Sequence, residues 1–212
     1  MEETKKREIT IGAVYSGISY QHGVLFRDEY RNIINILPIC EFGKIDLLEY
    51  DILIFPRGTD QEVVYAERKK IGRFLESKGI LISFGEVTKD WIPGCLWDGV
   101  VPEDDGPLSI IEKAHPIFKD LKDENLHWHK GATGWCCHGH FIAHQSSEIL
   151  VTNKIGYPMV YIDRQSTNGI ILIAGQLDAF CHIYVGIRGA EIFFENVLNW
   201  AENETKKLKG GE

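Results

Sequence analysis

The stretch Gly79-Ile-Leu-Ile-Ser-Phe-Gly-Glu-Val-Thr88 decides the fold that we predict for this chain. A glycine ends a helical pattern, Ile80 to Ser83 form a short apolar run, and Phe84-Gly85-Glu86 is typical of a sharp turn. Such a run predicts a buried strand, and ligands bind at the carboxyl ends of strands in open parallel α/β sheets. We therefore expect any functional site of this protein at the turn that follows the strand.

The segments before this stretch alternate between strand and helix patterns. They predict a strand at Glu8–Tyr15, a helix at Val24–Leu37, a short strand at Pro38–Phe42 and a strand at Asp51–Pro56. A further helix begins after an N-cap at Thr59 or Asp60 and runs to about Lys78, with Gly79 as its C′ residue. This alternation is typical of a parallel sheet with right-handed crossover connections.

The second half of the sequence adds further strands and a closing helix. Residues 87–106 show no pattern and predict a long loop, and strands follow at Ile149–Thr152, Pro158–Asp163 and Gly169–Ala174, with a hairpin turn at Ser166–Gly169. A helix begins at Gly186 or Arg188 and ends near Glu204. The fold class is therefore α/β: a single, doubly wound, mostly parallel sheet with helices on both faces and extra antiparallel strands in the C-terminal half. We expect one domain over residues 1–205 and a charged, frayed tail over 206–212.

Composition and charge exclude several classes of protein. The 212 residues are 44% hydrophobic and 25% charged, as in an ordinary globular domain, and the net charge of −8 disfavours binding to nucleic acid. Apolar runs are far too short for a membrane span, and no apolar segment of a signal peptide follows the charged N-terminus. Five scattered cysteines do not form a disulfide framework, so we expect a reduced, cytoplasmic protein.

Motifs in the second half point to a known superfamily. The first half of the chain has a strand, a Pro-x-Gly loop, a helix and a strand with a tight turn. Three motifs follow in the second half: Ala114-His-Pro-Ile-Phe-Lys-Asp-Leu121, Ile171-Leu-Ile-Ala-Gly-Gln-Leu-Asp178 and Phe193-Phe-Glu-Asn-Val-Leu-Asn-Trp-Ala201. Together these segments resemble the class I glutamine amidotransferase-like superfamily and are similar to its trehalose-utilisation-type and other non-glutaminase branches. The resemblance covers Ile9 to Ala201 and implies a flavodoxin-like fold.

The resemblance also implies what is missing from this chain. In the superfamily, the turn after the fourth strand is a nucleophile elbow with a cysteine in the pattern Gly-x-Cys-x-Gly. The matching segment here is Ser83-Phe-Gly-Glu-Val87, which has no cysteine, and the nucleophile position falls on Gly85 or Glu86. Since no thiolate is available to form a thioester, we expect no glutaminase activity.

The other site residues follow from the same resemblance. The superfamily takes a second oxyanion-hole donor from a glycine-rich loop, here Arg57-Gly58, and its histidine and acid partners follow a late strand, where this chain offers Gln176, Asp178 and His182. Arg57 beside a helix N-terminus would suit a carboxylate or phosphate, unless it forms a salt bridge with a surface acid. As catalytic groups, Glu86, His182 and Asp178 would form a base, a histidine and an orienting acid; otherwise Glu86 only caps its turn.

Cysteines and histidines provide two further alternatives. Cys95 in the long loop is a possible replacement nucleophile without an activating base, and Cys181 would point away from His182 if both lay on a strand. In the segment His127-Trp-His129 to Cys136-Cys137-His138-Gly-His140, an extended chain would place Cys136, His138 and His140 on one face, suited to Zn²⁺, and His129 on the wall of the ligand crevice. The spacing matches no known zinc motif, so hydrogen-bonded histidines in a β segment are the competing interpretation. No cofactor is expected, with zinc as the alternative.

Three functions remain open at this point. The leading hypothesis is a domain without glutaminase activity that binds a small polar or anionic molecule, or a protein partner, at the carboxyl ends of the strands. The second is a hydrolase of altered chemistry that uses Glu86, His182 and Asp178 or a bound metal. The third is a structural partner subunit whose crevice is filled by side chains. The scaffold alone does not choose between them.

Overall fold

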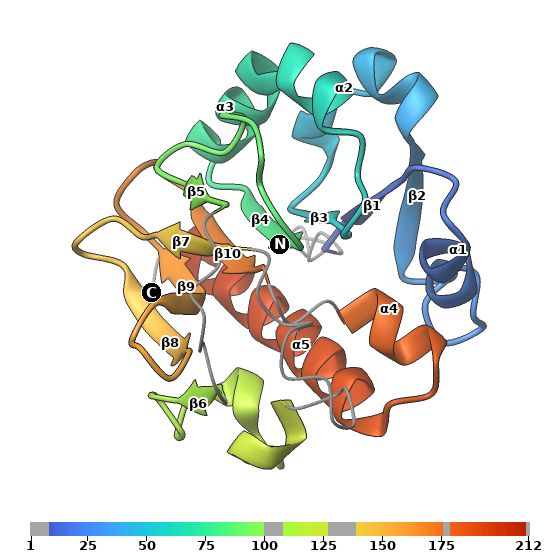
Figure 1. Ribbon diagram of the computed structural model, residues 1–212. Coiled ribbons are helices and arrows are strands. Elements are labelled where there is room, and N and C mark those ends of the chain that lie inside the picture. Colours follow the sequence, from blue (N-terminus) through green and yellow to red (C-terminus); the bar gives the residue numbers. More distant parts are fainter. Residues whose placement is uncertain (1–8, 100–107, 127–138, 176–178, 211–212) are drawn as a thin grey trace, which may run out of the picture.

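A computed structural model describes residues 9–99, 108–126, 139–175 and 179–210. Within these residues an eight-stranded mixed sheet spans the molecule (Figure 1). Its strands, in spatial order, are β2 (Ile34–Pro38), β1 (Ile11–Tyr15), β3 (Ile52–Phe55), β4 (Ile80–Phe84), β10 (Ile170–Ala174), β9 (Pro158–Asp163), β8 (Glu148–Thr152) and β6 (Ser109–Ile110). A separate antiparallel pair joins β5 (Leu96–Asp98) to β7 (His140–Ile142).

The direction of the strands confirms the predicted fold class. The five strands β2, β1, β3, β4 and β10 pair in parallel. The strands β9, β8 and β6 continue the sheet in antiparallel pairs, and all three come from the C-terminal half of the chain. A hairpin turn joins β9 to β10, as predicted, and the carboxylate of Asp163 accepts the backbone N–H groups of Gln165 (2.7 Å) and Ser166 (3.0 Å) inside it.

Helices cover both faces of the sheet, also as predicted (Figure 1). The helices α1 (Ser19–Leu25), α4 (Ala179–Tyr184) and α5 (Arg188–Gly210) pack on one face, and α2 (Gln61–Ala66) and α3 (Arg68–Glu76) on the other. Because strand side chains alternate, Ile80 and Ile82 belong to the first apolar core and Leu81 to the second. Short 3₁₀ helices are η1 (Ile39–Lys44), η2 (Leu47–Glu49), η3 (Pro116–Phe118) and η4 (Asp123–Leu126).

The helix predicted over Val24–Leu37 is wrong, and so is the strand over Pro38–Phe42. The helix α1 ends at Leu25, turns follow, and the chain enters β2 at Ile34, so the strand lies several residues earlier than expected. The sequence predicted for the strand forms η1 instead. Pairing with β1 from Ile11 onward selects the extended form of β2, which a local apolar pattern does not reveal.

The helix predicted from residue 60 to residue 78 is present but divided into two. Asp60 is the N-cap of α2, Glu67 separates α2 from α3, and α3 ends at Glu76. The left-handed residue after α3 is Lys78 (φ 65°), not Gly79. Gly79 serves a steric purpose, since a Cβ atom there would lie 2.3 Å from the ring of Phe74.

The closing helix extends further than predicted. The helix α5 continues to Gly210 through most of the segment that we expected to be a frayed tail. Near its end, the ammonium group of Lys209 pairs with the carboxylate of Asp51, which is buried at the start of β3 and also accepts the N–H of Thr10 (2.7 Å). This contact ties the C-terminal turn of the helix to the sheet. Among the described residues, no helix is both long and apolar enough to cross a membrane.

Candidate functional site

The candidate site lies where three neighbouring parallel strands end. The strand β3 lies between β1 and β4, so the segments that leave these strands, Ser16–Gly17, Pro56–Thr59 and Gly85–Glu86, emerge at the same edge of the sheet. The carboxyl edge of a parallel sheet is the position at which open α/β folds bind ligands. The structure thus brings together the two segments that the sequence singled out, Arg57-Gly58 and Gly85-Glu86.

Arg57 and Glu86 form a bidentate ion pair across this edge. Arg57 donates from Nε to Glu86 Oε2 (3.1 Å) and from Nη2 to Glu86 Oε1 (2.8 Å). The two side chains are 31% and 22% exposed, so solvent reaches the pair. Two parallel bonds between a guanidinium and a carboxylate fix the orientation of both groups. Glu86 is therefore more than a local cap of its turn, because both of its carboxylate oxygens bind Arg57.

Gly85 occupies the strained position of the turn. Its φ is +88°, a region that residues with a side chain seldom adopt. A Cβ atom at this position would also lie 2.6 Å from Cγ and 2.8 Å from Cβ of Arg57. The arginine side chain thus fills the space into which an elbow side chain would project, which gives a physical reason for glycine here.

The helix α1 holds the backbone of the arginine in place. The carbonyl oxygen of Arg57 accepts hydrogen bonds from Tyr20 Oη (3.1 Å) and Gln21 Nε2 (2.8 Å), and Gln21 Oε1 accepts the N–H of Ser16 (2.8 Å). Gly58 lies directly beneath this contact, with φ +75° and room for no Cβ between Ile18 and Tyr20. Gln21 is fully buried. Sequence reasoning missed Gln21 as a site residue, because a glutamine in a turn-rich segment gives little signal.

Gln61 holds the other side of the turn. Its Nε2 donates to the carbonyl of Glu86 (2.7 Å), and its Oε1 accepts from the N–H of Thr88 (3.1 Å) and from Nε1 of Trp91 (2.9 Å). Trp91 is buried against Phe55, with ring centroids 4.7 Å apart. The glutamine therefore connects α2, the turn after β4 and the following loop through one amide group, and no sequence pattern predicts this role.

The N-terminus of α2 is already occupied by its own cap. The carboxylate of Asp60 accepts the backbone N–H groups of Glu62 (2.9 Å) and Val63 (3.3 Å). Since these groups would otherwise bind an anion, the expected cooperation between Arg57 and the helix N-terminus is not supported. The guanidinium of Arg57 is a charged donor at this edge.

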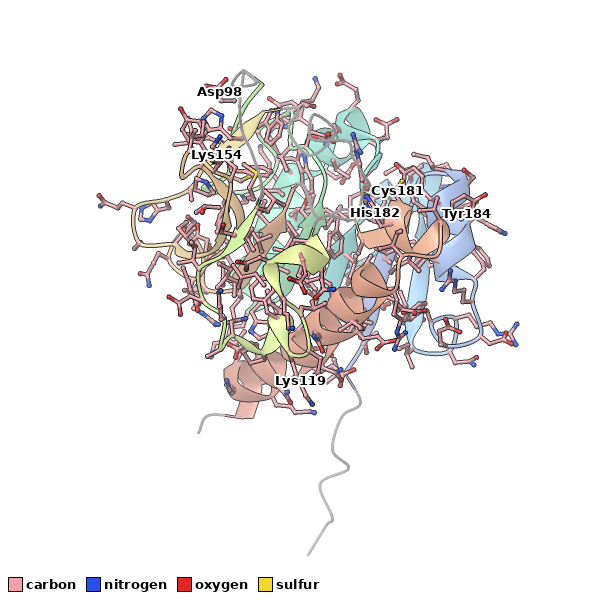
Figure 2. All side chains as sticks on the ribbon, turned by 60° about the horizontal axis from the view of Figure 1, so that its bottom comes forward. Asp98, Lys119, Lys154, Cys181, His182 and Tyr184 are labelled. Atoms are coloured by element: carbon pink, nitrogen blue, oxygen red, sulfur yellow. The ribbon has the colours of Figure 1, made fainter. Side chains whose placement is uncertain are left out.

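The expected partners after the last parallel strand are placed only in part. Gln176 and Asp178 lie outside the described residues. His182 and Cys181 both lie on the helix α4, not on a strand as assumed, with His182 buried and Cys181 half-buried (Figure 2). The expectation that the two residues point to opposite faces of a strand is therefore wrong in its premise, although neighbouring residues on a helix also point in different directions.

Cys95 does not have the environment of an activated thiol. It lies next to β5 and is buried, and burial raises the pKa of its thiol to about 12. A reactive cysteine needs the opposite shift, because the thiolate is the nucleophile. The structure thus gives no support to Cys95 as a replacement for the missing elbow cysteine.

The predicted metal ligands fall mostly outside the part of the chain that the structure describes. This applies to Cys136 and His138, and His129, predicted for the wall of the ligand crevice, also lies outside the described residues. His140 is described: it is buried on β7, and its ring stacks on Tyr157 with centroids 3.8 Å apart. Within the described residues, no group of three or more potential ligands could hold a metal ion. Zinc binding stays a prediction.

Comparisons with known proteins extend the picture of the fold. No family model matches the chain, and no curated protein matches its sequence. Among solved structures, Cytoplasmic Protein STM1381 from Salmonella typhimurium LT2 has a TM-score of 0.59 and 11% identity over 91% of this chain and 99% of that one. The β-galactosidase from Rahnella sp. R3 has a TM-score of 0.52 and 12% identity, and covers 92% of this chain and 31% of its own. The exo-β-1,4-mannosidase Op5Man5 from Opitutaceae bacterium strain TAV5 has a TM-score of 0.52 and 12% identity, over 91% of this chain and 36% of that one.

These similarities show the fold and no more. The chain spans about a third of the length of the two glycosidases, and nearly all of the length of STM1381. Sequence identity is too low for any of the three to lend its activity to this chain.

Proposed function

We propose that this chain is a binding domain on an amidotransferase-like scaffold, that it lacks glutaminase activity, and that it holds a small polar or anionic molecule beside Arg57. The observation that carries the proposal is the bidentate pair between Arg57 and Glu86 at the carboxyl edge of β3 and β4. A side chain fixed in this way is ready to bind before any ligand arrives, which lowers the entropy lost on binding.

The free part of the guanidinium supports the same conclusion. Both bonds to Glu86 come from Nε and Nη2, and Nη1 has no hydrogen-bond partner within the described part of the chain. The side chain of Arg57 is partly exposed, so solvent and a ligand can reach it. A hydrogen bond from a charged donor contributes about 1.5–3 kcal/mol, so this group would add roughly tenfold or more to the affinity for a small molecule.

The absence of an elbow nucleophile favours binding over hydrolysis. Gly85 holds the strained position without a side chain, so the turn presents no thiol or hydroxyl nucleophile there. The alternative, a hydrolase that uses Glu86, His182 and Asp178, involves Asp178, which lies outside the described residues. The proposal includes a cytoplasmic location, in line with the name of STM1381, and a partner that is a small molecule and not nucleic acid.

A thermal-shift screen of small polar and anionic compounds tests the proposal. We expect at least one compound to raise the melting temperature of the wild type, and to raise that of Arg57→Ala much less, because stabilisation grows with ligand affinity. The control variant is Arg68→Ala, which removes an exposed arginine on α3 that lies over Tyr65. Equal stabilisation of all three proteins by every active compound would refute a site at Arg57.

A further inference from the structure

We infer that the Arg57–Glu86 pair selects a neutral group that carries a hydrogen-bond acceptor and a donor side by side, in preference to a carboxylate or a phosphate. This inference rests on the proposed function and narrows its class of ligand. It follows from the donors and acceptors that the pair leaves free, from the charge around the pair, and from the rigidity of Arg57.

The pair presents donors and acceptors next to each other. A guanidinium has five N–H donors, and Arg57 uses two of them for Glu86, from Nε and Nη2. The remaining donors lie on Nη1 and on the second N–H of Nη2. Each oxygen of Glu86 accepts one bond from Arg57 and keeps a further lone pair. A ligand group with an acceptor beside a donor can therefore bind both members of the pair, whereas a carboxylate has acceptors only.

The charge around the pair is also unfavourable to a second anion. Glu86 cancels the charge of Arg57, and two carboxylates follow shortly after Arg57 in the chain, Asp60 at the N-cap of α2 and Glu62 in its first turn, of which Glu62 pairs with Lys89 (2.7 Å). These five side chains comprise three acids and two bases. The whole chain carries a net charge of −8. An anion at Nη1 would therefore be attracted by the guanidinium and repelled by the carboxylate of Glu86 that is bound to it.

The backbone and the first side-chain carbons of Arg57 are held in place opposite Glu86. Its carbonyl is bound by Tyr20 and Gln21, and its side chain packs directly over Gly85. Binding of an anion must then take place with Glu86 alongside, or must break both bonds of the pair. A neutral group avoids either penalty, so the geometry and the charge favour the same class of ligand.

Acetamide and acetate provide a matched pair of probes, because they are planar and of nearly equal size and differ in charge and in the donor. Each is titrated into ¹⁵N-labelled protein at constant ionic strength, and the Nε–H resonance of Arg57 is followed, assigned by its absence in Arg57→Lys. We expect acetamide to bind roughly threefold or more tightly than acetate, the scale of a partly exposed charge interaction. In Glu86→Gln the preference should reverse, since the local negative charge is gone.

A second variant separates this effect from a general change of charge. Glu76→Gln removes one negative charge at the end of α3, where Glu76 binds Asn168, and should keep the preference for acetamide. Tighter binding of acetate to the wild type would overturn the inference and leave the proposed function intact. An unchanged preference in Glu86→Gln would also overturn it. If neither probe moves the Arg57 resonance, the proposed site itself fails.

Discussion

A substitution at Gly85 tests the structure of the elbow most sharply. Alanine there must adopt a left-handed backbone, φ +88°, which costs roughly 1–2 kcal/mol for a residue with a side chain. Its Cβ would also lie 2.6 Å from Cγ of Arg57, so the arginine must move and loses its pair with Glu86. For a partly exposed pair that loss adds about 0.2–1 kcal/mol. We expect Gly85→Ala to lower the free energy of unfolding by about 1–3 kcal/mol in total.

Two other glycines separate the two contributions. Gly17 has φ +80°, and a Cβ atom there would have no neighbour within 4 Å, so Gly17→Ala should show the backbone cost alone. Gly72 has neither a positive φ nor a close neighbour and lies inside α3, so Gly72→Ala should stabilise the protein by about 0.5–1 kcal/mol. Urea unfolding of the three variants measures the series. Equal stabilities of Gly85→Ala and Gly17→Ala would refute the claim that Arg57 fills the elbow.

Lys209→Ala should destabilise the protein by about 1–3 kcal/mol in urea unfolding, because it leaves the buried carboxylate of Asp51 without its charge partner. Lys207→Ala removes an exposed lysine and should cost less than about 1 kcal/mol. Equal losses of stability in the two variants would contradict the role of the C-terminal contact. Asp60→Ala should lower the free energy of unfolding by about 1 kcal/mol, and Asp60→Asn should change it little, because asparagine also serves as an N-cap. Identical melting temperatures of the two variants would argue against the role of Asp60 as a cap. Burial lowers the pKa of His115 below its ordinary 6.5, so the unfolded chain takes up the proton first and the stability of the fold decreases as the pH drops below 6.5. His115→Gln should weaken this part of the pH dependence of stability. The same pH dependence in His115→Gln and the wild type would contradict the prediction.

The central strands could be predicted from sequence because each has a clear local pattern of apolar residues. The strands β1, β3, β4 and β10 are short runs of buried β-branched and apolar residues, a pattern that both faces of a covered sheet require. The strand β2 could not, since Leu25, Tyr30 and Ile34 fit a helical spacing equally well and only pairing with β1 decides. A local pattern predicts a strand when both of its faces are buried, because burial then requires apolar residues along its whole length.

The candidate site could be predicted as a list of residues but not as an arrangement. Arg57 and Glu86 were both expected at the edge, one as a ligand-binding residue and the other as a catalytic one. Their pairing depends on the register of β3 against β4, in which Phe55 lies opposite Ser83, and sequence patterns do not give a register. Gln21 and Gln61 act through single amide groups and belong to no motif, so only the structure reveals them.

The most direct test of binding at Arg57 is a calorimetric titration of the best compound from the thermal-shift screen into wild type, Arg57→Ala and Arg68→Ala. We predict that binding weakens about tenfold or more in Arg57→Ala, the loss of one charged hydrogen bond, and stays unchanged in Arg68→Ala. Circular dichroism confirms that the variants are folded. The same dissociation constant in all three proteins would contradict the claim that this edge of the sheet binds its ligand through Arg57.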